Sequence, residues 1–333
     1  MQFSTYLSQA FDNQSLPESL QQQFQIYHQN YLDAATKKCS LDAAEALCLQ
    51  WLKVIIEDLK NPFVFPPYHK KIRTPVDLFL FGKEFFSVLV DDDASRVLNL
   101  HRLDEIRNYL ARGDNVILFA NHQTECDPQL MYYLLGKTHA DILENLIFVA
   151  GDRVTSDPLA RPFSMGCDLL CIYSKRHINT PLEQREEKLH HNQKSMKTLR
   201  SLLHEGGKFI YVAPAGGRDR KTNNNLLYPA DFQADSIEMF RLLAKSSSNP
   251  AHFYPLALKT YDVLPPPPSI EDAIGEYRAI FFAPIFFNFG EEVSLDHLCS
   301  EEEIAHFDKH KQRAIRAERV FSIVKQLYQE LQT

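Results

Sequence analysis

The chain has 333 residues, of which 44% are apolar and 24% charged, and its formal net charge is −7. These proportions are ordinary for a globular protein, and the length exceeds what one hydrophobic core usually supports, so we expect one large domain and one smaller one. The longest apolar run, residues 279–287, contains a proline and is far shorter than the roughly 20 residues that span a bilayer. We therefore expect no transmembrane segment.

The first fifteen residues have neither the basic and apolar regions of a signal peptide nor the arginines of a transit peptide. We expect a protein of the bacterial cytoplasm, or of the plastid stroma if a transit peptide has been removed. The six cysteines form no CxxC pair, which favours reduced core thiols over disulfides or zinc ligands. No metal or other cofactor is expected.

The charge is unevenly distributed. Residues 151–221 carry 13 Lys and Arg against 8 Asp and Glu, a net charge of +5, which leaves −12 for the rest of the chain. A basic segment on an acidic protein indicates a local anionic partner, such as a phosphate group or an acidic protein, rather than nucleic acid. The alternative is an ordinary surface of mixed charge.

Residues 1–60 are predicted to be helical, because apolar residues recur at three- and four-residue steps, most clearly between 41 and 59. Four prolines within residues 62–75 indicate a linker. We therefore expect a small helical-bundle domain with its linker over residues 1–74, followed by a larger domain over residues 75–333.

The larger domain alternates short apolar runs with longer helical patterns, which predicts an α/β fold with a mixed, mostly parallel sheet flanked by helices. The predicted strands lie within residues 115–120, 146–151, 168–174, 208–214, 252–259 and 277–287. The predicted helices lie within residues 129–136, 182–207 and 234–246, and one long helix covers 300–331.

The stretch ANHQTECDP, residues 120–128, places His122 and Asp127 directly after a buried strand, in an H-x4-D pattern. Because Pro128 suits the first position of a helix, Asp127 is predicted to be the N-cap of that helix. A helix start could also bring the carboxylate back to His122, where it would fix the tautomer and leave the other ring nitrogen as a general base. A turn histidine beside a purely capping aspartate is the alternative.

A first basic cluster, Lys175, Arg176 and His177, follows the predicted strand at 168–174. A second cluster follows the strand at 208–214, where Arg218 and Arg220 come after two glycines. Two guanidinium groups beside accessible backbone amides form a good receptor for phosphate. In the alternative for the first cluster, these residues form a solvated loop. In the alternative for the second, Asp219 pairs with a neighbouring arginine in a purely structural loop. Together with His122, the clusters suggest activation of a hydroxyl group on a phosphorylated substrate.

Four blocks of the sequence together resemble the soluble, plastid-type glycerol-3-phosphate 1-O-acyltransferases. In chain order they are NHQTECDP, FVAGDRV with the segment up to SKRHI, IYVAPAGGRDR and YPLALKTYDVLPPPP. The resemblance covers roughly residues 75–290. It implies acyl transfer from an acyl-carrier-protein (ACP) or acyl-CoA thioester to the sn-1 hydroxyl of glycerol 3-phosphate. The product would be 1-acyl-sn-glycerol 3-phosphate, the first intermediate of phospholipid biosynthesis on the way to phosphatidic acid.

The resemblance also implies residue roles. His122 would deprotonate the hydroxyl, Asp127 would orient and stabilise its imidazole, and the alkoxide-like oxygen would attack the thioester without an acyl-enzyme. The residues at the family's phosphate-binding positions are Arg176, His177, Arg218 and Arg220, and we add the adjacent Lys175. Acyl carrier protein, as a transient partner, could dock on the basic segment at Lys188, Lys194, Lys197 and Arg200. Two positions depart from the family pattern: Cys126 stands where plant members have alanine, and Ala215 replaces a serine.

Three alternatives remain open. Cys126 could be a nucleophile activated by His122, as in a thioesterase or a ping-pong acyltransferase. A metal-dependent hydrolase could use His122, Glu125, His190 and His191, although two adjacent histidines on one helix cannot both face one site. A module that binds lipid or acyl carrier protein without catalysis would need no base.

Overall fold

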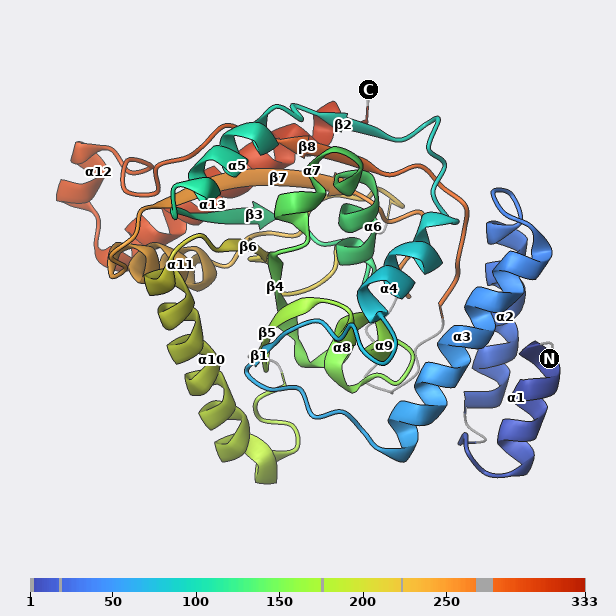
Figure 1. The fold of residues 1–333 in the computed structure, drawn as a ribbon. Coiled ribbons are helices and arrows are strands. Elements are labelled where there is room, and N and C mark those ends of the chain that lie inside the picture. Colours follow the sequence, from blue (N-terminus) through green and yellow to red (C-terminus); the bar gives the residue numbers. More distant parts are fainter. Residues whose placement is uncertain (1–2, 18–19, 175–176, 223, 268–277, 333) are drawn as a thin grey trace.

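The computed structural model describes residues 3–17, 20–174, 177–222, 224–267 and 278–332 of the chain (Figure 1). Its N-terminal part consists of three helices, α1 (Phe3–Asp12), α2 (Gln21–Ala35) and α3 (Leu41–Lys60). Ser40 caps α3 by accepting a hydrogen bond from the Ala43 amide, and α3 buries one apolar face that includes Trp51. The helical prediction for residues 1–60 is therefore confirmed. Within the described residues, no helix is both long and apolar enough to cross a membrane.

Eight strands of the described residues form one sheet in the order β1-β5-β4-β6-β3-β7-β8-β2. Their bounds are β1 Tyr68–His69, β2 Arg96–Leu98, β3 Asn115–Ala120, β4 Leu146–Gly151, β5 Asp168–Ile172, β6 Phe209–Val212, β7 Ala251–Lys259 and β8 Phe286–Phe289. Neighbouring strands run parallel, except that β1 is antiparallel to β5 and β7 to β8. The predicted mixed, mostly parallel sheet is confirmed.

Helices cover both faces of this sheet. The central strand β3 is therefore buried on both sides, which explains why its sequence is apolar throughout. Val116 and Leu118 point into one core, whereas Ile117 and Phe119 point into the other. The first core is shared with α4 (Leu78–Ser87), α5 (Arg102–Ala111), α6 (Asp127–Leu134), α7 (Gly136–Leu143) and α9 (Arg161–Met165). The second is shared with α10 (Arg185–Glu205), α11 (Ala234–Lys245) and α13 (Lys309–Glu330). A strand buried on both faces needs apolar residues at every position.

The structure differs from the sequence predictions in several elements. The predicted strand at 277–287 is reduced to β8, which begins at Phe286; Pro284 just before it cannot donate a hydrogen bond to a sheet. The predicted C-terminal helix is divided into α12 (Glu301–His306) and α13, because Phe307 is extended and Asp308 caps a new helix start. Helices α4 and α5 and strand β2 were not predicted, and the segment expected to be a linker contributes β1.

Helix α2 packs against α4 and helix α3 against α9, and the N-terminal helices share the first core with the α/β part (Figure 1). The Tyr31 hydroxyl donates to the carbonyl of Phe85 at 2.8 Å, and the Trp51 indole donates to the carbonyl of Leu159 at 3.2 Å. Because buried polar groups of this kind need their partners, these bonds fix the helices to the rest of the chain. A division into two domains at residue 74 stays a prediction.

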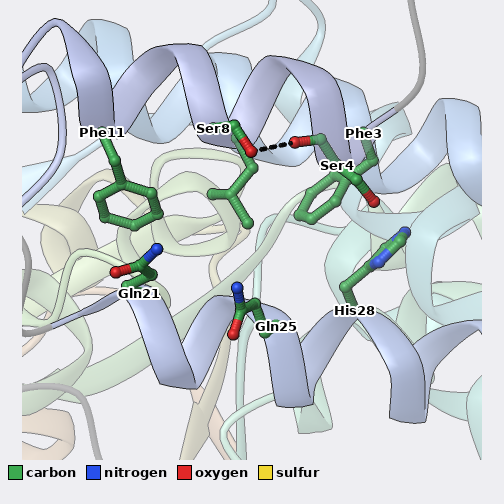
Figure 2. A pocket seen from close by; sticks show the side chains of 8 residues that line it. Phe3, Ser4, Ser8, Phe11, Gln21, Gln25 and His28 are labelled. Carbon is green, nitrogen blue, oxygen red and sulfur yellow. Dashed lines mark hydrogen bonds between the residues drawn. The ribbon is translucent and has the colours of Figure 1, made fainter.

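A cavity of about 240 Å³ lies between α1 and α2 (Figure 2). Its lining residues are Phe3, Ser4, Leu7, Ser8, Phe11, Gln21, Gln25 and His28. The His28 ring stacks on Phe3 with centroids 3.9 Å apart, and burial lowers the pKa of His28, although nearby Glu45 opposes this effect. Among the described residues, none of those predicted to be catalytic or phosphate-binding lines this cavity.

Candidate active site

The chemically rich segments of the chain follow neighbouring parallel strands. In the order β5-β4-β6-β3-β7 these five strands all point the same way, so their carboxyl ends meet at one edge of the sheet. With about 4.8 Å between strands, the ends of β5 and β3 are roughly 14 Å apart. Residues after the strand ends are His177 (β5), Asp152 (β4), Arg218 (β6), His122 (β3) and Thr260 (β7). This edge is where open α/β sheets bind ligands.

His122 and Asp127 are in direct contact, as the H-x4-D pattern suggested. The Nδ1 atom of His122 lies 2.7 Å from Oδ2 of Asp127. The Asp127 side chain is 1% exposed, whereas that of His122 is 26% exposed. A buried carboxylate thus holds a partly accessible imidazole, which is the arrangement that a general base requires.

The prediction that Asp127 is an N-cap is wrong. Cys126 occupies the cap position without a side-chain cap bond, and Asp127 is the first residue of α6. Its carboxylate instead accepts hydrogen bonds from the Gln123 amide at 2.9 Å and from the Thr260 hydroxyl at 2.5 Å. Thr260, at the end of β7, was not predicted as a site residue. These two donors hold the carboxylate in one orientation before any substrate binds.

A second His–Asp pair joins the ends of β5 and β4, which lie three and two strands from β3. The Nδ1 atom of His177 is 2.8 Å from Oδ2 of Asp152, the first residue of α8 (Asp152–Ser156), and Oδ1 of Asp152 accepts from the Ser174 amide at 3.2 Å. Asp152 therefore ties the loop after β5 to the end of β4. Lys175 and Arg176, predicted in the same loop, lie outside the described residues.

Arg218 and Arg220 occupy the loop after β6, and both are half-buried. The loop turns at Gly216, whose φ of +71° favours glycine and where a Cβ atom would lie 3.2 Å from the Gln233 side chain. Arg220 donates to the carbonyl of Pro267. The alternative that Asp219 pairs with a neighbouring arginine is wrong, because its buried carboxylate accepts from Asn121, Gln123 and the Ala230 amide.

Cys126 is 1% exposed, and its sulfur lies 3.3 Å from the Thr124 hydroxyl. Burial raises the pKa of this thiol well above its ordinary value. A thiolate is the reactive form of cysteine, so this environment disfavours a nucleophilic role for Cys126.

The residues of the alternative metal site are engaged elsewhere. Glu125 forms an ion pair with the buried Arg278, which also binds Asp157 at 2.9 Å. The Nε2 atom of His191 lies 3.1 Å from the carbonyl oxygen of Cys171, and His190 is exposed. Within the part of the chain that the structure describes, these side chains form no cluster with His122 that could hold a metal ion.

Comparisons with known proteins place this chain in a family. A family model described as "Acyltransferase" matches residues 99–259, which contain His122, Asp127 and both arginines. The glycerol-3-phosphate acyltransferases ATS12 and ATS11, chloroplastic, of Cucurbita moschata are 38% and 36% identical over 96% and 98% of this chain. The chain belongs to the glycerol-3-phosphate acyltransferase family.

The chloroplastic glycerol-3-phosphate acyltransferase of Spinacia oleracea is 40% identical over 84% of this chain. The chain spans 61% of the length of the spinach family member, and 69% and 73% of ATS12 and ATS11. The solved 1-acyl-sn-glycerophosphate acyltransferase PlsC of Thermotoga maritima aligns with 77% of this chain and 79% of its own. Its 18% identity and TM-score of 0.43 are too low to support an inference.

Proposed function

We propose that this chain transfers a fatty acyl group from a thioester to the sn-1 hydroxyl of glycerol 3-phosphate, giving 1-acyl-sn-glycerol 3-phosphate. The observation that carries the proposal is the buried Asp127 bound to the accessible His122, on the same sheet edge as Arg218, Arg220 and His177. A base and several cationic groups within a few strand spacings suit a small substrate with a hydroxyl at one end and a phosphate at the other.

In the proposed reaction, Asp127 accepts from the Nδ1–H of His122, which leaves Nε2 as the basic nitrogen. Nε2 takes the proton of the substrate hydroxyl while the oxygen attacks the thioester carbonyl carbon. The carbon–sulfur bond then breaks, and the imidazolium returns the proton to the thiolate that leaves. Asp127 stabilises the imidazolium throughout, as in other His–Asp pairs. No covalent acyl-enzyme forms, in agreement with the raised pKa of the buried Cys126.

The phosphate is proposed to bind to His177, Arg218 and Arg220, with Lys175 and Arg176 as further ligands. Asp152 would act through His177 by holding its Nδ1, which stabilises the cationic ring and directs its other nitrogen to the phosphate. The two His–Asp pairs therefore have different proposed roles: one moves a proton, and the other presents a positive charge.

The Asp152→Asn variant is expected to raise the KM for glycerol 3-phosphate about tenfold, because a hydrogen bond to a charged group contributes roughly 1.5–3 kcal/mol. Its kcat should stay within about twofold of that of the wild type, because His177 takes no part in proton transfer. Initial rates measured across a range of glycerol 3-phosphate concentrations test this. A large fall in kcat with an unchanged KM would show instead that the second pair takes part in the chemical step.

The proposed donor is acyl-ACP or acyl-CoA. In the first case, the acidic carrier protein would dock on Lys194, Lys197 and Arg200, which are exposed on α10, a helix that extends beyond the sheet (Figure 1). Lys188, expected on the same surface, is buried instead and donates to the carbonyl oxygens of His177 and Thr180. It supports the loop of His177 and is not available to a partner.

Reversing the charge of Lys194, Lys197 and Arg200 together, by replacement with glutamate, is expected to raise the KM for acyl-ACP about tenfold at low salt. The KM for acyl-CoA should be unchanged, and the difference should shrink as ionic strength rises. Assays with both donors at two salt concentrations measure this. An unchanged KM for acyl-ACP would exclude this surface as the docking site.

The proposed activity is tested by incubating the purified chain with glycerol 3-phosphate and acyl thioesters of several chain lengths, carried either by the carrier protein or by CoA. We expect release of free thiol that depends on glycerol 3-phosphate, together with an equal amount of monoacylated product. Thiol release that proceeds equally without glycerol 3-phosphate would favour the thioesterase alternative. The cellular compartment stays a prediction from the sequence.

A further inference from the structure

Asp219 is a fully buried carboxylate between the two partly exposed arginines of the loop after β6. Its Oδ2 accepts hydrogen bonds from the Asn121 side chain at 2.7 Å and from the Gln123 side chain at 3.2 Å. Its own backbone amide donates to the carbonyl of His122 at 2.6 Å. We call the segment after β6 that carries Arg218 and Arg220 the arginine loop. Three consecutive residues at the end of β3, including the proposed base, are thus joined to Asp219 of this loop.

The network continues away from Asp219 into β7 and the C-terminal helix. The Asn121 side chain forms two hydrogen bonds with the backbone of Leu258, both 2.9 Å long. The Gln123 side chain accepts from the amide of Thr260 at 2.8 Å and donates to the Tyr328 hydroxyl at 3.2 Å. Since Thr260 also donates to Asp127, the arginine loop and the His122–Asp127 pair are held by one connected set of buried hydrogen bonds.

We propose that Asp219 is a positioning residue that sets the distance from Arg218 and Arg220 to the Nε2 atom of His122, and so selects which hydroxyl of the substrate is acylated. This inference rests on the proposed function. The terminal hydroxyl of glycerol 3-phosphate is one carbon farther from the phosphate than the middle hydroxyl, a difference of roughly 1.5 Å. A misplacement of about 1 Å can change a rate by about 10², so a loosened loop would lose this selection.

The Asp219→Asn variant is a specific test, because the three hydrogen-bond partners of this carboxylate among the described residues are all donors. Oδ1 accepts from the Ala230 amide at 2.9 Å, and Oδ2 accepts from Asn121 and Gln123. An asparagine of the same size must turn its NH₂ group towards one of these donors, which breaks that connection. Burial raises the pKa of Asp219 to about 6 although its donors favour the charged form.

The experiment compares two substrate analogues: 1,3-propanediol monophosphate has only the terminal hydroxyl, and 1,2-propanediol 1-phosphate has only the middle one. The ratio of their kcat/KM values reports hydroxyl selection and is not affected by acyl migration in the product. We expect the wild type to favour the terminal hydroxyl and Asp219→Asn to reduce this ratio at least tenfold. The exposed Asp231, in the same loop, provides the control: Asp231→Asn should leave the ratio unchanged.

A second variant guards against simple loss of folding. Gln123→Glu keeps the oxygen that accepts from Thr260 but replaces the donor to Asp219 and Tyr328 with a second carboxyl oxygen. Because this oxygen repels Asp219, the variant should lower the ratio in the same direction. Equal losses for both analogues, or an unchanged ratio in both variants, would overturn the inference and leave Asp219 a purely structural residue. Wild-type turnover of glycerol 3-phosphate, measured in parallel, tests the proposed function separately.

Discussion

The His122→Ala variant is expected to lower kcat for acyl transfer by about 10²- to 10⁴-fold, the range that a positioned general acid–base contributes. His122 is the partly exposed member of a pair whose other member is buried, so the substitution removes the reactive nitrogen without opening the core. The proposed phosphate ligands belong to other loops. The variant should therefore still bind glycerol 3-phosphate, with a Kd within about threefold of the wild-type value.

Steady-state kinetics combined with calorimetric titration of glycerol 3-phosphate separate the possible outcomes. Binding without turnover supports the base assignment. Normal turnover would show that His122 is not the base, and loss of binding together with activity would make it a substrate ligand or a structural residue. If the wild type itself binds glycerol 3-phosphate and an acyl thioester but never turns over, the chain is a binding module.

The Asp127→Asn variant should also lower kcat strongly, by about 10²- to 10⁴-fold, while the free energy of unfolding changes little. The geometry allows this separation. The asparagine oxygen can accept from both His122 and Gln123, and its NH₂ group can donate to the Thr260 hydroxyl in place of the bond at Oδ1. Only the negative charge that stabilises the imidazolium is lost.

The second His–Asp pair provides a matched control for this substitution. Asp152→Asn makes the same chemical change at a pair of nearly equal length, 2.8 Å against 2.7 Å, yet it should change KM rather than kcat. Kinetics and thermal unfolding of both variants measure the contrast. Equal effects on kcat would contradict the separate roles assigned to the two pairs.

The Cys126→Ala variant distinguishes direct attack from a ping-pong mechanism. Direct attack predicts that turnover stays within about threefold of the wild-type value, because Cys126 is a buried residue beside the site and takes no part in the proposed reaction. Loss of activity together with an acyl group trapped on this sulfur in the wild type would contradict the proposed mechanism.

The fold class and the contact between His122 and Asp127 were predictable because their signals are local. Continuous apolar runs mark strands that are buried on both faces, and a helix that starts five residues after His122 brings the carboxylate back to it. The same local reasoning failed for the N-cap, because capping rules consider only neighbouring residues. Thr260, more than 130 residues away, and the Gln123 amide take up the carboxylate instead.

The contacts of Asp152, Thr260 and Asp219 could not be predicted because they depend on which strands are neighbours. The order β5-β4-β6-β3-β7 does not follow the order along the chain, so a sequence alone does not show that the loop after β6 contacts the end of β3. Lys188 illustrates the same limit. From the sequence, a lysine in a basic helix is expected to be exposed, but the structure buries Lys188 against a neighbouring loop. Lys175 and Arg176 remain predicted phosphate ligands outside the described residues.

The most direct test of the central claim is one assay that follows both thiol release from an acyl thioester and the acylated product, in the wild type and in His122→Ala. The account predicts that the wild type releases one thiol for each molecule of 1-acyl-sn-glycerol 3-phosphate formed, and only when glycerol 3-phosphate is present. It predicts that the variant binds glycerol 3-phosphate but forms product at least about 10²-fold more slowly. Undiminished product formation by the variant, or wild-type thiol release that needs no glycerol 3-phosphate, would contradict the account.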